Sequence, residues 1–165
     1  MTELAIEISP ELSGDAATVE RLHEHAFGPG RFARAAFRLR EESGHIKELA
    51  FVARVGTLAA GSVRVSAISI GGRPALALGP LTVEPAFGNR GIGARLMQAA
   101  VEAAKARGDG FMILVGDEPY YARFGFRRVP PGRITLPGPA DPARILYLEL
   151  QTGALAGMQG SAKPA

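Results

Sequence analysis

The chain has 165 residues, of which 47% are hydrophobic and 21% are charged, and its formal net charge is +3. This composition predicts one globular domain with a real core and excludes global disorder, which requires low hydrophobicity and high net charge. The absence of cysteine excludes a disulfide scaffold, a thiolate zinc site and a cysteine nucleophile, and with three histidines a histidine-rich metal centre is not expected.

The predicted elements follow from hydrophobic periodicity and from turn residues. In chain order they are a strand at 4–8, a helix at 16–27, a helix at 32–42, strands at 48–55, 60–70 and 74–83, a helix at 91–106, a strand at 111–115, a short helix at 119–124, a strand with a loop at 126–136 and a closing strand at 144–150. Gly79 and Pro80 lie inside the third of the middle strands. Because proline removes a ladder donor, we expect a bulge or an unpaired stretch there.

This order of elements predicts a mixed α/β (α+β) fold, in which a largely antiparallel sheet is flanked by helices and contains one central βαβ unit. Residues 1–150 are predicted to form a single domain. Residues 151–165 are rich in Gly, Ala, Ser and Gln without periodicity, which predicts a flexible C-terminal tail. No apolar run approaches the roughly 20 residues of a membrane span, and no export signal is visible at the N-terminus, so we expect a cytoplasmic protein without a membrane partner.

The sharpest local feature is a glycine-rich loop between a predicted strand and the longest predicted helix, Gly88-Asn89-Arg90-Gly91-Ile92-Gly93-Ala94. Its glycines let the backbone turn tightly and approach a ligand closely. The first turn of the helix leaves several N–H groups without intrahelical partners, and together with the helix dipole they favour an anion such as a phosphate. Arg90 and Arg95 add positive charge beside the loop.

Three interpretations of this loop compete. A P-loop requires Lys-Ser/Thr after its last glycine, and because Ala94-Arg95 stands there, that interpretation fails. A dinucleotide fingerprint fits Gly91 and Gly93 but meets Leu96 at its third glycine position, while Asp117 follows the next strand where a ribose-binding acid would lie. The third interpretation is a glycine-rich helix start that binds nothing.

Three segments in this order and spacing resemble the GNAT N-acetyltransferase superfamily, and within it a bacterial branch of predicted acetyltransferases. They are Leu78-Gly79-Pro80-Leu81-Thr82-Val83-Glu84-Pro85, the loop at 88–93, which follows the pattern Gln/Arg-x-x-Gly-x-Gly/Ala, and Tyr121-Ala122-Arg123-Phe124-Gly125-Phe126, which follows Tyr-x-x-x-Gly-Phe. The chain departs from the pattern at Gly88, where the family usually has Gln or Arg. This departure removes a side chain and leaves the backbone amides in place.

The resemblance implies acetyl-CoA as the acyl donor and no metal. The diphosphate of CoA would be held by the backbone of the loop residues Gly88, Asn89, Arg90, Gly91, Ile92, Gly93 and Ala94. The pantetheine arm would pair with main-chain groups of Leu81 and Val83 as an added strand would, and the Leu81 amide would polarise the thioester carbonyl. Tyr121 matches the general acid of the family, which protonates the departing thiolate, and Tyr120 would pack or line the acceptor pocket.

The general base is not evident from the sequence. Asp117 and Glu118 follow a strand near the expected cleft, but their expected role is to cap the short helix. Some family members place a glutamate within the strand before the loop, where this chain has Ala77. Glu84 stands at the strand end, beyond where a base would reach.

Two further groups of side chains in the N-terminal part are interpreted as surface residues. His23 and His25 are expected to be solvated on the first helix. Arg34, Arg38 and Arg40 either form a solvated helix face or contact an acidic acceptor.

The sequence therefore predicts an acetyl-CoA-dependent N-acetyltransferase that acts on a primary amine by direct attack in a ternary complex, since no cysteine can carry the acyl group. The acceptor stays open among small amines, antibiotics, amino acids, protein amines and aminoacyl-tRNA, the last being the one form of nucleic acid considered. A monomer or a homodimer is expected. The alternatives are a non-catalytic acyl-CoA-binding or partner-binding module on the same fold and, third, a nicotinamide-binding domain.

Overall fold

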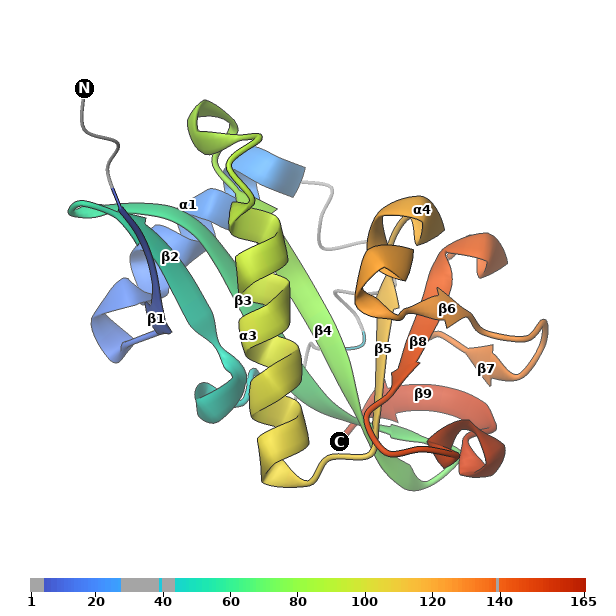
Figure 1. Ribbon diagram of the computed structural model, residues 1–165. Helices are drawn as coiled ribbons and strands as arrows, with labels where there is room; N and C mark the ends of the chain where they lie inside the picture. The colour runs from blue at the N-terminus through green and yellow to red at the C-terminus, as the bar shows by residue number, and fades with distance from the viewer. Residues whose placement is uncertain (1–4, 28–38, 40–43, 139) are drawn as a thin grey trace.

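A computed structural model describes residues 5–27, 39, 44–138 and 140–165 (Figure 1). Its strands are β1 (Ile6–Pro10), β2 (Phe51–Val55), β3 (Leu58–Ile70), β4 (Arg73–Val83), β5 (Phe111–Val115), β6 (Arg127–Arg128), β7 (Ile134–Thr135), β8 (Ile145–Glu149) and β9 (Gly160–Pro164). Its α-helices are α1 (Ala16–Phe27), α3 (Ile92–Arg107) and α4 (Glu118–Tyr121). Short 3-10 helices cover Ser13–Asp15, Lys47–Leu49, Pro85–Phe87, Ala122–Phe124, Pro142–Arg144 and Ala154–Gly157.

The strands form one mixed sheet with the order β1-β2-β3-β4-β5-β8-β6, while β9 pairs with both β3 and β7. Among the described strands, the pairs are antiparallel except β4 with β5 and β7 with β9. The helix α3 crosses from β4 to the parallel strand β5 and so makes the expected βαβ unit. The prediction of a largely antiparallel sheet with one such central unit is confirmed.

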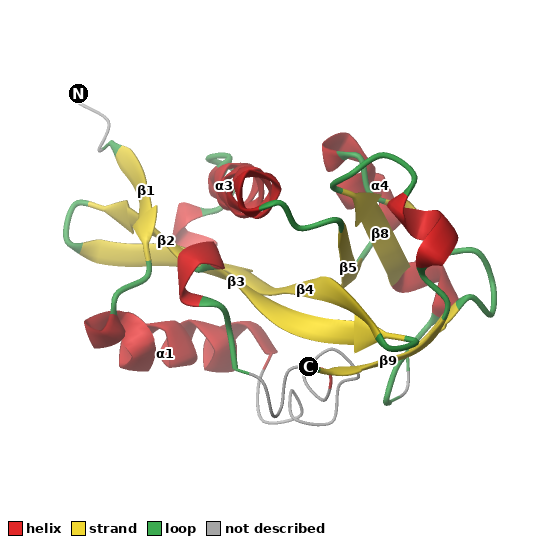
Figure 2. Cartoon of the chain, turned by 90° about the horizontal axis from the view of Figure 1, so that it is seen from below, coloured by secondary structure: helices red, strands yellow, loops and turns green. Residues whose placement is uncertain are grey.

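Helices cover both faces of the sheet. Figure 2 shows α1 on one face and α3 on the other, with α4 on the same side as α3. The helix α3 packs on the sheet through a stripe of buried residues at helical spacing, which are Ile92, Leu96, Met97, Ala100, Val101 and Ala104. Gly108 ends this helix in the left-handed conformation, with a φ of 88°. This packing fixes the first turn of α3 beside the end of β4.

The C-terminal segment is ordered, so the predicted flexible tail at 151–165 is wrong. Residues Ala162 to Pro164 of β9 pair with Ile68 to Ile70 of β3, and β9 also pairs with β7. Met158 and Ala162 are buried. A short Gly-, Ala- and Ser-containing strand has little periodic signal of its own. It forms here because it pairs with the part of the β3 edge that β2 does not cover.

Some predictions fall outside the described residues. The predicted helix at 32–42 is described only at Leu39, which is buried and helical. The arginines Arg34, Arg38 and Arg40 lie outside the described residues. Within the described ranges, no helix has the length and apolar character needed to cross a membrane.

Candidate functional site

The strands β4 and β5 separate after a short stretch of pairing. They pair at Leu76 with Met112 and at Ala77 with Ile113, and then diverge toward their C-terminal ends (Figure 1). Next to this point the register of the β3–β4 pairing shifts between Val63 and Val65. As a result, a single residue of β3 faces both Gly79 and Pro80. The expected irregularity at Gly79-Pro80 is therefore confirmed, and it lies where β4 leaves β5.

The divergence leaves main-chain groups of β4 directed at an open edge. The Glu84 N–H donates to the Ala60 carbonyl at 2.8 Å, so Glu84 belongs to a hydrogen-bonded pair of the antiparallel ladder. Bonded and non-bonded pairs alternate along such a ladder. Leu81, opposite Val63, and Val83, opposite Gly61, are therefore in non-bonded positions, and their N–H and C=O groups face the split. This is the arrangement that an added strand, or an amide-bearing ligand, requires.

The glycine-rich loop follows directly on this edge. Asn89 and Gly91 have φ angles of 61° and 74°, in the left-handed region that favours glycine and asparagine. Gly91 is the N-cap residue of α3 and provides no capping side chain, and the helical ladder begins with the Arg95 N–H donating to the Gly91 carbonyl at 3.1 Å. The N–H groups of Ile92, Gly93 and Ala94 precede this bond and so form a cluster of donors at the positive end of the helix dipole.

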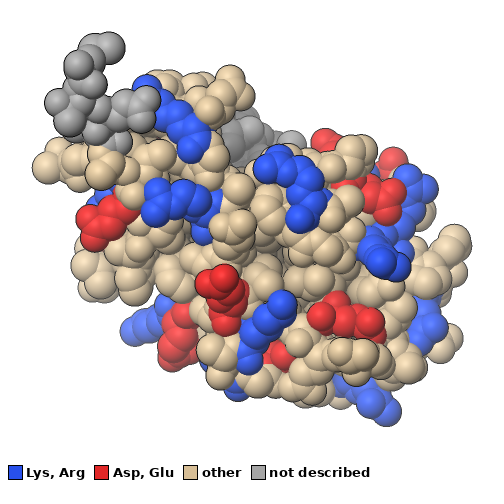
Figure 3. Space-filling view, viewed as in Figure 1, with Lys and Arg blue, Asp and Glu red and all other residues tan. Residues whose placement is uncertain are grey.

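The two loop arginines differ in position. The Arg95 guanidinium donates to the Ile6 carbonyl at 2.8 Å and thus ties α3 to β1. The Arg95 side chain is therefore directed toward β1, while its positive charge stays in the first turn of α3. Arg90 remains at the loop, with its guanidinium carbon 5.6 Å from the centre of the Phe87 ring. Across the face with α3, acidic and basic side chains are interspersed (Figure 3). Local donors rather than a broad basic field therefore favour an anion at the loop.

Tyr121 lies at the other side of the split, on α4. A Cβ on Gly116, just after β5, would overlap the ring carbons of Tyr121, so the ring rests directly on the backbone of Gly116. Burial raises the pKa of the Tyr121 phenol above its usual value, and Tyr120 and Asp117 act in the same direction, while Arg144 opposes them. The phenol therefore stays protonated at neutral pH and can serve as a proton donor.

Tyr120 points to a different part of the site than Tyr121, as expected from their adjacent positions. A Cβ on Gly93 would lie 2.8 Å from the Tyr120 hydroxyl oxygen and 3.7 Å from Cγ2 of Val83. The Tyr120 hydroxyl thus lies against the first turn of α3, where the loop and the end of β4 meet. The sequence assigned Tyr120 to packing or to an acceptor pocket and did not predict this contact, because it depends on how α4 docks against α3.

The carboxylates after β5 are engaged with arginines. Asp117 is the N-cap residue of α4, but its side chain makes no capping hydrogen bond and instead pairs with Arg144 at 3.2 Å. Glu118 accepts the backbone N–H of Arg128 at 3.1 Å. The expectation that the Asp117 side chain caps the short helix is wrong. Both carboxylates are therefore already held by partners within the protein.

A carboxylate–imidazole pair lies on the opposite face of the sheet, beside α1. His25 Nδ1 and Glu84 Oε1 are 3.0 Å apart, and this contact joins the last turn of α1 to the end of β4. The His25 side chain is 67% exposed, as expected for a surface residue. His23 is buried, so the expectation that it is solvated is wrong. No local signal in the sequence relates His25 to Glu84, because 59 positions separate them.

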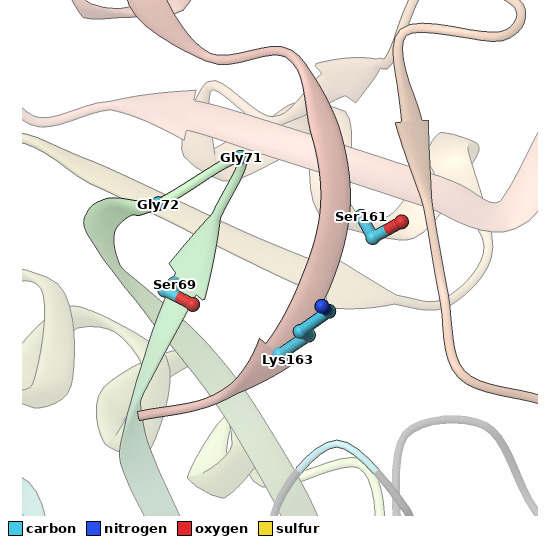
Figure 4. A pocket seen from close by; sticks show the side chains of 5 residues that line it. All are labelled: Ser69, Gly71, Gly72, Ser161 and Lys163. Atoms are coloured by element: carbon cyan, nitrogen blue, oxygen red, sulfur yellow. The ribbon is translucent and has the colours of Figure 1, made fainter.

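A hollow of about 460 Å³ lies far from this site, at the turn between β3 and β4 (Figure 4). It is lined by Ser69, Gly71, Gly72, Ser161 and Lys163. The turn lies at the far end of β4 from Val83, so the hollow is separate from the split. Within the described ranges, no group of three or more His, Asp or Glu side chains is placed to hold a metal ion.

Comparisons with known proteins agree with this architecture. Residues 47–128 match a family model described as an acetyltransferase (GNAT) domain. The chain is 28% identical over 116 residues to YjhQ, an uncharacterized N-acetyltransferase of Escherichia coli K12, and this alignment covers 68% of the chain and 64% of YjhQ. Thus the match spans somewhat less than two thirds of that relative.

Two solved structures share the fold. The GNAT family N-acetyltransferase YhbS of E. coli, in complex with CoA, superposes with a TM-score of 0.84 and 23% identity over 100% of this chain and 92% of its own. A GNAT family acetyltransferase of Brucella melitensis, in complex with acetyl-CoA, has a TM-score of 0.73 and 24% identity over 98% and 96% of the two chains.

Proposed function

Because the chain belongs to the GNAT acetyltransferase family, we propose that it transfers the acetyl group of acetyl-CoA to a primary amine. One observation carries this proposal: the open edge of β4 runs straight into the donor cluster at the start of α3. An extended amide-bearing arm that ends in a diphosphate has the complementary shape and charge. The complexes of YhbS with CoA and of the Brucella protein with acetyl-CoA support this choice of ligand.

The proposed donor site is made mainly of backbone groups. The loop from Gly88 to Ala94 holds the diphosphate through its N–H groups, with Arg90 adding charge, and main-chain groups of Leu81 and Val83 pair with the pantetheine amides. Because the donors belong to the backbone, glycine at position 88 leaves this set intact. The side chain of Ile92 is buried, so Ile92 contributes only its N–H.

The same geometry provides two groups for the chemistry. The Leu81 N–H faces the split and can donate to the thioester oxygen as negative charge develops on it. Tyr121 is held neutral by burial and can protonate the departing thiolate. With no cysteine to carry an acyl group, the amine attacks the thioester directly, in a ternary complex.

Two measurements test the proposal. Calorimetric titration with acetyl-CoA is expected to give saturable binding, and a free-thiol assay over a panel of small amines, amino acids, aminoglycosides and peptide N-termini is expected to identify an acceptor. Binding without thiol release on any acceptor would instead support a non-catalytic acyl-CoA-binding module. Binding of NADH in place of acetyl-CoA would overturn the assignment of the loop.

A further inference from the structure

The two faces of the split have different surroundings. Along β4, Leu81 and Val83 pack on the core cluster beneath α3, whereas Thr82 is buried against Ser62. Because side chains alternate along a strand, Glu84 shares the face of Thr82, which is the face covered by α1. If the donor arm occupies the α3 side of the split, an acceptor amine reaches the thioester from the α1 side. A base for that amine therefore belongs on the α1 side.

We infer that His25, oriented by Glu84, accepts the proton that the acceptor amine loses. The inference rests on the proposed acetyl transfer. Glu84 follows Leu81 by three residues, or about 10 Å along an extended strand, so the proton passes from the amine to His25 through intervening water. The bond from nitrogen to the acetyl carbon forms, the carbon–sulfur bond breaks, the amine proton goes to His25 Nε2, and the thiolate receives its proton from Tyr121.

The Glu84 contact determines which nitrogen of His25 can act. An ionised carboxylate only accepts hydrogen bonds, so at 3.0 Å the His25 Nδ1 must carry the hydrogen. The neutral imidazole then has its lone pair on Nε2. With 67% of the side chain exposed, the imidazole is open to solvent. The same logic underlies carboxylate–histidine pairs in which the acid fixes the tautomer of the base.

The alternatives near the split are less suited to this role. Asp117 and Glu118 lie after β5, and their carboxylate oxygens already accept hydrogen bonds from Arg144 and from the backbone N–H of Arg128. His25 contacts Glu84 at the end of β4, and along α1 the charged residues nearest to it are Arg21, one turn earlier, and the adjacent Glu24. The Arg21 guanidinium donates to the Thr18 hydroxyl at 3.2 Å.

The test compares His25→Asn and Glu84→Gln with the wild type. Asparagine keeps an N–H near the position of Nδ1 and so preserves the contact with Glu84, but it cannot take up a proton. We expect kcat/KM of His25→Asn at neutral pH to fall about 10²- to 10⁴-fold, the usual contribution of a general base. Its pH profile should lose the rise in rate that deprotonation of a general base produces. Glu84→Gln should retain that rise at reduced kcat.

Controls separate this inference from the proposed function. Acetyl-CoA affinity, measured by calorimetry, should be the same in all the variants, and Glu20→Gln on the same helix should behave as the wild type. If the wild type releases thiol and His25→Asn keeps both its rate and the rise with pH, the inference is overturned while the transferase function stands. If the wild type binds no acetyl-CoA or acetylates no amine, both are overturned.

Discussion

Replacing Gly93 by alanine should weaken acetyl-CoA binding without destabilising the fold. The new Cβ would lie 2.8 Å from the Tyr120 hydroxyl oxygen and 3.7 Å from Cγ2 of Val83. The closer atom is the end of a side chain that can move by a few tenths of an ångström. Alanine in the helix also recovers about 0.5–1 kcal/mol relative to glycine. The free energy of unfolding should therefore change by less than about 1 kcal/mol.

The expected loss is in the free energy of acetyl-CoA binding and not in the stability of the free protein. A methyl group at position 93 stands beside the N–H donors that would hold the diphosphate, and it also pushes the Tyr120 hydroxyl toward them. Losing one hydrogen bond to a charged group costs about 1.5–3 kcal/mol, which is about a 10- to 150-fold rise in Kd. Calorimetric titration measures this Kd, and chemical denaturation measures the stability.

Two variants serve as controls for Gly93→Ala. A Cβ on Gly14 meets no atom within 4 Å, so Gly14→Ala should bind acetyl-CoA as the wild type does. Adding Tyr120→Phe removes the displaced hydroxyl and should restore the part of the affinity that was lost through Tyr120. If Gly93→Ala binds acetyl-CoA with the affinity of the wild type, the diphosphate does not approach this turn and the reasoning is refuted.

Three more predictions concern the acid, its support and the C-terminal strand. Tyr121→Phe should lower kcat by about 10² or more with acetyl-CoA Kd unchanged, while Tyr147→Phe on β8 should leave kcat unaffected. Since the pKa of Tyr121 is raised, wild-type kcat should show no basic limb below about pH 10, and a limb near neutrality would contradict this assignment. In Gly116→Ala the new Cβ overlaps the Tyr121 ring, so the variant should lose about 1–3 kcal/mol of unfolding free energy and have a lower kcat. If the variant keeps both the stability and the kcat of the wild type, the contact between Gly116 and the Tyr121 ring is refuted. Deleting residues 159–165 removes β9 and should lower the Tm, measured by circular dichroism, by about 5–10 °C. The affinity for acetyl-CoA should be retained. An unchanged Tm would mean that β9 adds no stability.

Local chemistry in the sequence was enough to predict the irregularity in β4 and the loop. Gly79-Pro80 marks the irregularity because proline lacks a donor, and the apolar stripe of α3 with Gly108 at its end defines the one long crossover helix. These signals are carried by adjacent residues or by helical spacing. The fold class followed from them because a strand, a helix and a second buried strand allow few arrangements.

Contacts that depend on docking could not be predicted in this way. The strand β9 is defined by the open edge of β3 rather than by its own composition, and the interaction of Arg95 with the Ile6 carbonyl depends on where β1 lies. The pair of His25 and Glu84 joins elements 59 residues apart, and burial of His23 depends on how α1 packs on the sheet. Such contacts are properties of the packed molecule and leave no periodic trace in the chain.

The central claim is that backbone amides of this chain hold acetyl-CoA between β4 and the start of α3. The most direct measurement is a titration of isotope-labelled protein with acetyl-CoA, followed by amide NMR shifts. The account predicts that the largest changes fall on Leu81, Val83 and residues 89–94, while amides of the distant turn at Gly71-Gly72 stay constant. If the shifts at saturation lie elsewhere and these amides do not move, the account is contradicted.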